Sequence, residues 1–188
     1  MGTAQMLMVV VAMFLLGIII FSANSTLADN DIVIKNSEFG VAAISLATSL
    51  IEEVEGKVFD EAATDSGVTK LVNLTPRAYF GPDANESYRT TDSTMSDFDD
   101  LDDFNGFSIE YVSDPSRPQV ATYRGDSKGF RADYLVNAKV VYVSAGGGVA
   151  DLNSFSTSPT WHKKLIVTVT SPSSRDTLVF PTIISYWD

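Results

Sequence analysis

The stretch MLMVVVAMFLLGIIIF, from Met6 to Phe21, contains no polar side chain, and the first charged residue after it is Asp29. A helix of this composition is apolar all round, so it must lie in lipid or against other apolar helices. At about 1.5 Å per residue, a helix over residues 2–28 would span roughly 40 Å. The hydrocarbon core of a membrane is about 30 Å thick. The stretch therefore predicts a membrane-spanning or bundled helix.

The chain carries no basic residue ahead of this stretch, because its first Lys or Arg is Lys35. A secretory signal peptide begins with a basic region and ends at a small-residue cleavage site. The two interpretations are an unusual anchor and a mature segment from which a basic leader has been removed. We expect the second.

The rest of the composition excludes several classes of function. The 188 residues include 24 acidic and 13 basic side chains, which argues against nucleic acid or an anionic membrane surface as a partner of the polar part. There is no Cys, so neither a disulfide nor a thiolate zinc site exists. His162 is the only histidine, and no phosphate-binding loop or G-x-S-x-G motif occurs. We expect no catalytic residues, and hence no enzyme.

A second pattern follows a polar segment over residues 22–38. Apolar residues then recur at helical spacing, at Phe39, Ala43, Leu46, Ala47, Leu50, Ile51, Val54 and Val58. This spacing predicts that the helix continues as an amphipathic half that ends near Phe59–Ala63 and lays its apolar face on the following domain. Poor helix formers in 22–38 predict loosening there.

From Val68 the pattern indicates β-structure. The predicted strands are Lys70–Tyr79, Phe107–Val112, Gln119–Arg124, Arg131–Val143, Leu165–Ser171 and Leu178–Tyr186. Leu165, Val167 and Val169 share one face, and the last two strands form a hairpin. Residues 81–103 and 146–159 are expected to be long loops.

These patterns together predict an α+β fold, in which a long N-terminal helix packs on a C-terminal antiparallel β-sheet domain. The expected parts are an apolar helix over 1–28, its amphipathic continuation over 29–63 and a β-rich head over 64–188.

Two further stretches carry a family resemblance. Residues 46–61 read LATSLIEEVEGKVFDE, and residues 97–106 read DFDDLDDFNG. Together with the uncharged N-terminal helix, they resemble the type IV pilin-like family, specifically the minor-pilin-like proteins of mannose-sensitive-haemagglutinin-type pili. The relatives have similar "LA-x-SLI-[DE]-E…FDE" and "FDD-[VI]-DD-[FY]-NG" runs. The remaining β region resembles the relatives only in being β-rich, and no motif in it matches theirs.

The resemblance implies a structural subunit that is held in the inner membrane by its N-terminal helix and then polymerises, with the pilus assembly machinery, into an extracellular filament of identical subunits. It also implies a methylated N-terminus and a role in adhesion. The implied filament-core residues are Met1, Gln5, Val9, Val10, Met13, Phe14, Leu16, Gly17, Ile20 and Phe21. Family members usually carry Glu where this chain has Gln5, so we expect a weaker, hydrogen-bonded version of their assembly contact. The alternative functions are a membrane-tethered binding module and a pseudopilin of a secretion system.

The acidic run supports two interpretations. Asp99, Asp100, Asp102 and Asp103 offer the oxygen ligands that calcium prefers, although the run does not follow the EF-hand pattern. The alternative is a helical turn with Phe98, Leu101, Phe104 and Phe107 inward and the aspartates outward. Asn73 and Asn85 begin sequence triplets that match glycosylation acceptors.

Overall fold

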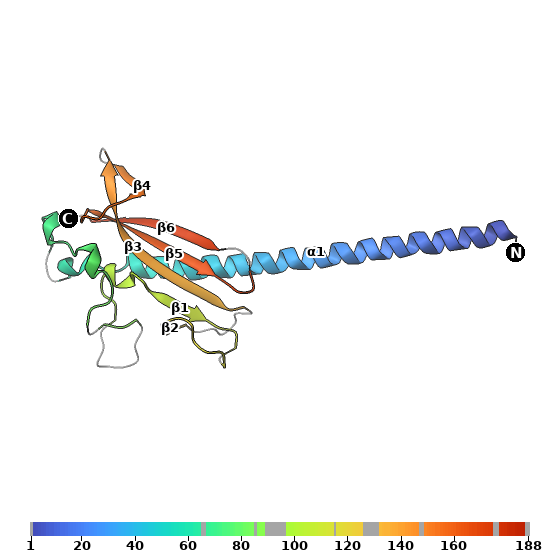
Figure 1. Cartoon of the computed structure of the whole chain (residues 1–188), viewed down its shortest axis with the longest axis horizontal. Coiled ribbons are helices and arrows are strands. Elements are labelled where there is room, and N and C mark those ends of the chain that lie inside the picture. Colours follow the sequence, from blue (N-terminus) through green and yellow to red (C-terminus); the bar gives the residue numbers. More distant parts are fainter. Residues whose placement is uncertain are drawn as a thin grey trace. The chain divides into compact units, whose positions relative to one another are not determined.

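The computed structural model describes residues 2–64, 67–84, 86–88, 97–114, 116–125, 132–146, 149–174 and 177–186, with the backbone only at 145–146 and 149–153. Its contacts divide the chain into two units, Met1–Val41 and Ala42–Asp188. The α+β fold is confirmed, with the long helix α1 (Thr3–Glu55) contributing residues to both units and the sheet lying in the second (Figure 1).

Helix α1 is continuous through residues 22–38, so the predicted loosening is wrong. The polar side chains there are accommodated within the helix. The Thr26 hydroxyl donates to the Ser22 carbonyl at 3.0 Å, and Lys35 pairs with Asp31 one turn earlier at 2.7 Å. The predicted end near residues 59–63 is also wrong. The α-helix ends at Glu55 and is followed by Gly56, and η1 (Glu61–Ala63) is a separate 3₁₀ turn.

The sheet has the strand order β2-β1-β3-β5-β6, and β4 pairs with β3 off this path. The strands are β1 (Ser108–Tyr111), β2 (Tyr123–Arg124), β3 (Tyr134–Gly146), β4 (Val149–Phe155), β5 (His162–Thr170) and β6 (Leu178–Ser185). All pairings are antiparallel except β1 with β2. The predicted hairpin of the last two strands is confirmed, and the outer strand β6 contains Pro181 opposite Ile166.

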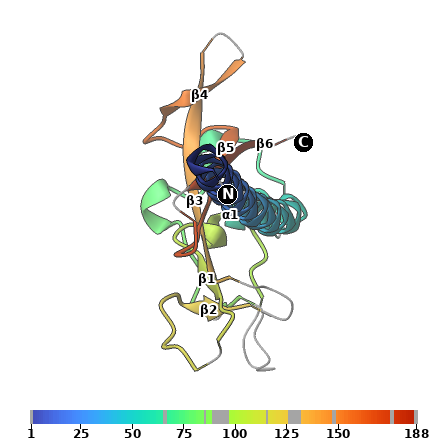
Figure 2. The ribbon, with the colours of Figure 1, turned by 90° about the vertical axis from the view of Figure 1, so that its right-hand side faces the viewer.

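Three β predictions are wrong in part or in whole. Residues 70–79 form two 3₁₀ turns, η2 (Leu71–Asn73) and η3 (Arg77–Tyr79), because Pro76 lacks an N–H and the Thr75 N–H is bound by a side chain. In 119–124 only the last two residues form a strand. The predicted loop 146–159 contains β4, which forms a hairpin with the long β3 at the edge of the unit (Figure 2).

The core of the second unit lies between the sheet and the C-terminal part of α1. Ala43, Ala47, Leu50 and Val54 form the buried stripe of the helix. On β5, the odd-numbered positions Leu165, Val167 and Val169 are buried, as the alternation predicts. The same alternation places Lys163 on the buried face of β5.

Candidate functional site

The large apolar side chains at the N-terminal end of α1 are exposed. Those from Met6 to Phe21 are between 49% exposed at Val11 and 78% exposed at Phe21. The helix is long and apolar enough to cross a membrane and lies near the N-terminus, by the criteria of length and composition, so it can serve as a membrane anchor or signal.

The residues predicted to form a filament core lie on this helix. At about 100° per residue, the members of the set from Val9 to Phe21 lie on one side of the helix, and Gly17 leaves open space where a Cβ would stand. The Gln5 side chain accepts a hydrogen bond from the Gly2 N–H at 3.3 Å. Met1 lies outside the described residues.

The two stretches that carry the family resemblance meet in the second unit. The backbone of Val58 forms a parallel bridge with Asp100, through hydrogen bonds from the Val58 N–H to the Asp99 carbonyl and from the Leu101 N–H to the Val58 carbonyl. The Lys57 ammonium donates to the Phe98 carbonyl at 2.5 Å. The segment that follows α1 is therefore hydrogen-bonded to the acidic run.

The acidic run forms a short helical turn, η4 (Asp102–Phe104), with its apolar side chains inward as one interpretation predicts. The expectation that the aspartates point outward is wrong for Asp100, Asp102 and Asp103, which are all buried. Asp100 accepts hydrogen bonds from the N–H groups of Asp102 and Asp103, so its side chain caps the turn. Only Asp99 of the four predicted ligands is exposed.

A charged cluster that the sequence interpretation missed lies next to this turn. The Lys163 ammonium is fully buried and donates to Asp60 Oδ2 at 2.7 Å, to Asp102 Oδ1 and to the Phe59 carbonyl at 2.8 Å. The Tyr142 hydroxyl, from the residue opposite Lys163 in the sheet, lies 3.1 Å from Asp60 Oδ2 and 2.8 Å from the Thr75 carbonyl. We call Lys163, Asp60, Asp102 and Tyr142 the buried charge cluster.

Burial acts to raise the carboxyl pKa values in this region, and the positive charge of Lys163 acts to lower them. Burial raises the pKa of Asp102 to about 8, although the Lys163 charge opposes this change. Burial also acts to raise the pKa of Asp60, but the Lys163 charge and hydrogen bonds from Lys163 and Thr75 outweigh it, so the net shift is downward. Burial raises the pKa of Asp100 to about 7, and burial with the Asp100 charge raises that of Asp103 to about 8.

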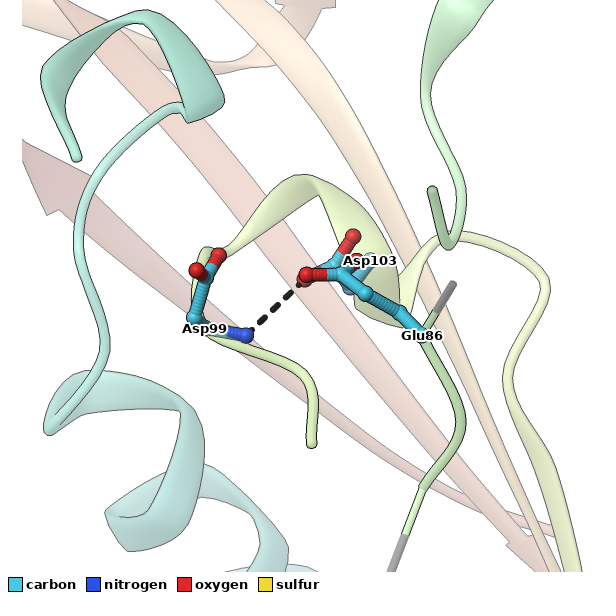
Figure 3. Close-up of side chains that lie close together, drawn as sticks. All are labelled: Glu86, Asp99 and Asp103. Atoms are coloured by element: carbon cyan, nitrogen blue, oxygen red, sulfur yellow. Dashed lines mark hydrogen bonds between the residues drawn. The ribbon is translucent and has the colours of Figure 1, made fainter. Parts of the chain in front are cut away.

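A different set of acids gathers where a cation was predicted. Carboxylate oxygens of Glu86, Asp99 and Asp103 lie within 4.8 Å of one another. Figure 3 shows these side chains together, with the Asp99 N–H donating to Asp103 Oδ2 at 3.1 Å. Asp100 and Asp102 have other partners. Calcium binding stays a prediction, and its ligand set would now include Glu86 in place of those two.

The remaining candidate residues are the single histidine and the two asparagines of the glycosylation triplets. The His162 ring lies 2.7 Å from the Ser185 hydroxyl on the neighbouring strand. Asn73 is exposed on η2, whereas the hydroxyl of Thr75 in its triplet donates to Asp60 Oδ1. Asn85 lies outside the described residues. Glycosylation and the absence of enzymatic activity stay predictions.

No protein-family model, curated protein or solved structure matches this chain.

Proposed function

We propose that this protein is a structural subunit of an extracellular filament, anchored in a membrane by α1 before assembly and joined to identical subunits through α1 afterwards. The observation that carries the proposal is the exposure of every large apolar side chain from Met6 to Phe21. Such a surface requires an apolar environment that the chain itself does not supply. Lipid supplies it before assembly, and a bundle of identical helices supplies it in the filament.

The free energy gained when α1 moves from lipid into a bundle of identical helices is small, because the two environments are equally apolar. Association then depends on close side-chain packing and on hydrogen bonds between helices rather than on the hydrophobic effect. Gly17 permits close helix approach, because it has no side chain and the space beside its Cα is open. A contact between different surfaces of successive copies, repeated without closing, produces a helical fibre.

The second unit supports the proposal because its fold does not depend on the apolar segment. Among the described residues, the buried ones begin at Ala43. The segment from Thr3 to Val41 can therefore exchange lipid for other helices while the core of the second unit stays intact. Most of the chain's net charge of −11 lies in residues 42–188, and this acidic charge keeps such a unit soluble outside the cell.

Gln5 bears on how strong the assembly contact is. A carboxylate at this position would need a positive partner inside an apolar bundle, and a half-made ion pair there is costly. The neutral amide of Gln5 can hydrogen-bond to a neighbouring N-terminus without that cost. It already accepts a hydrogen bond from the Gly2 N–H within the chain.

The test is negative-stain microscopy of filaments sheared from cells, with the chain identified in them by antibody. Wild type should yield labelled fibres. Val10→Asp places a charge on the exposed apolar surface and should abolish the fibres, whereas Val72→Asp makes the same change at an 82% exposed position of the second unit and should leave them unaltered.

Labelled fibres from the Val10→Asp variant would contradict the helical-core proposal. Absence of wild-type fibres, with the protein released only by detergent, would favour the membrane-tethered binding module. Recovery of wild type in short assemblies attached to a secretion complex would favour the pseudopilin.

A further inference from the structure

The Lys163 amine is held against two carboxyl groups at a position that water does not reach. Its nitrogen is fully buried and has an acceptor for each of its three N–H groups, in Asp60, Asp102 and the Phe59 carbonyl. Aromatic rings surround it, with the centroids of Phe59 at 4.6 Å and Phe80 at 5.0 Å. This is an amine and two acids in fixed contact inside an apolar enclosure.

The two carboxyl groups have very different surroundings. Besides Lys163, Asp60 accepts hydrogen bonds from the Thr75 N–H and hydroxyl at 3.0 Å and from the Ala62 N–H at 3.2 Å. For Asp102, Lys163 supplies the hydrogen bond to Oδ1, while Oδ2 is buried and has no partner among the described residues. Such an unsatisfied oxygen is rare in a folded protein and calls for an explanation.

The difference assigns chemical roles to the two acids. Burial acts to raise the pKa of Asp60, whereas the charge of Lys163 lowers it. A proton passed from the ammonium to Asp60, 2.7 Å away, removes both buried charges together and with them the cause of the lowered pKa. Asp102 has the less favourable surroundings for a negative charge, because its Oδ2 is buried with no partner among the described residues, so of the two acids it is the one that holds a proton. A neutral acid is the form that an amine can attack, because a carboxylate repels nucleophiles.

We propose that Lys163 and Asp102 condense within the folded chain to form an intramolecular amide bond, with Asp60 accepting the proton that the ammonium must lose. The site is thus a self-modification site, and it is independent of the function proposed above.

The Lys163 ammonium gives one proton to the Asp60 carboxylate and becomes a neutral amine. The amine nitrogen forms a bond to Asp102 Cγ, and the bond from Cγ to one carboxyl oxygen breaks. That oxygen leaves with its hydrogen and a second proton from the nitrogen as one water molecule. The products are a neutral amide, a protonated Asp60 and water, so no oxidant or co-reactant is required.

The bond would link β5 to η4 across a sequence separation of 61 residues. A covalent link between distant positions restricts the unfolded chain, as a disulfide does, and this sequence contains no Cys with which to form one. Asp102 keeps only one oxygen in the amide, so the product no longer buries a second carboxyl oxygen without a partner.

The decisive experiment is mass spectrometry of the intact full-length chain, extracted in detergent from cells. The folded protein should be lighter than its sequence mass by one water molecule, and this deficit should survive denaturation and hydroxylamine. Protease digestion should yield a branched peptide that joins the segment containing Lys163 to the segment containing Asp102. Hydroxylamine treatment distinguishes an amide from a cyclised aspartate, which it opens.

Three variants assign the roles. Asp102→Asn should form the same amide with loss of ammonia in place of water, and so reach the same product mass. Asp60→Asn removes the proton acceptor and should slow bond formation about a hundredfold, which is a typical contribution of a positioned base. Asp99→Asn changes an exposed acid of the same run and should leave the bond unchanged. Circular dichroism confirms that each variant is folded.

The proposal is overturned if folded wild-type protein has its full sequence mass. It is equally overturned if the missing water maps to a peptide that is not branched. A branch from Lys163 to Asp60, or bond formation in Asp60→Asn at the wild-type rate, would overturn the assignment of roles.

Discussion

The segment Met6–Phe21 and the turn around Asp100–Phe104 depart from the usual distribution of residues in opposite directions. The first is apolar and exposed, whereas the second buries three aspartates and lies against the buried Lys163. Apolar surface left in water and charge removed from water are both unfavourable, so each region implies a compensating partner. The charged region finds its partner inside the chain, in Lys163 and in backbone N–H groups, whereas the apolar segment must find its partner outside.

The two regions should therefore respond differently to substitution. The charged region is self-contained, so substitutions there should alter the stability of the second unit. The apolar segment is incomplete, so substitutions there should alter what the chain associates with and leave the second unit folded.

The largest effect of a single substitution is expected from Lys163→Met in the full chain. This variant loses both the contact of the amine with Asp60 and the proposed bond to Asp102, and breaking a buried ion pair alone costs about 3 to 5 kcal/mol. The free energy of unfolding from urea titration in detergent measures the loss. A variant within about 1 kcal/mol of wild type would show that the cluster is not the stabilising element of this region.

A somewhat smaller effect is expected from Leu16→Asp in the apolar segment. A charged residue at the centre of a membrane helix costs about 2.5 to 3.5 kcal/mol. A large fraction of the variant protein should therefore move from the membrane pellet to the supernatant after alkaline extraction. The unfolding transition of the second unit should not change. Val72→Asp is the matched control and should remain in the pellet. A pellet fraction of Leu16→Asp equal to wild type would refute the membrane-anchor interpretation.

The stability of the second unit should decrease as the pH rises. Asp100 and Asp103 have folded pKa values of about 7 and about 8 against an ordinary value of 3.8, so between these limits the folded state binds more protons than the unfolded state. Each unit of pKa difference contributes about 1.4 kcal/mol, so the decrease between about pH 4 and pH 8 should amount to several kcal/mol. Urea titrations in EDTA at several pH values measure it.

Asp100→Asn serves as the control for this pH dependence. The amide oxygen can still accept the hydrogen bonds that cap η4, but the side chain no longer titrates. The slope of stability against pH should therefore become shallower. Wild-type stability that is constant or increases over this range would contradict the burial of neutral carboxyl groups.

The smallest effect is expected from Lys35→Gln. Lys35 pairs with Asp31 at 2.7 Å, which resembles the Lys163–Asp60 distance, but both side chains of this pair are about 60% exposed. Exposed pairs contribute little because water and salt screen them. The unfolding transition should be indistinguishable from that of wild type. A loss comparable to that of Lys163→Met would refute the contrast between the buried and the exposed pair.

The sequence predicted those parts of the fold that depend on periodicity. The spacing of Ala43, Ala47, Leu50 and Val54 predicted the buried helix stripe, and the alternation on β5 predicted its buried face. Residues 70–79 have strand-like composition, but the fold gives them no strand partner and Asp60 binds Thr75, so local propensity was misleading there.

The buried charge cluster could not be predicted by charge alone, because aspartates in a run usually face water. A signal was nevertheless present. Lys163 occupies a position in phase with Leu165 and Val167, so the alternation already placed a lysine on the buried face. A lysine there requires carboxylates from elsewhere in the chain, and only the fold shows that they come from Asp60 and Asp102, far away in sequence.

Pro181 in the outer strand β6 affects whether the sheet edges of neighbouring copies can pair. An assembly that holds many copies side by side brings their sheet edges close together, and an open edge readily recruits a strand from a neighbour. Pro181 has no N–H to offer such a strand, so it interrupts the row of donors along β6. Pro181 therefore disfavours edge-to-edge strand pairing between neighbouring copies of the chain.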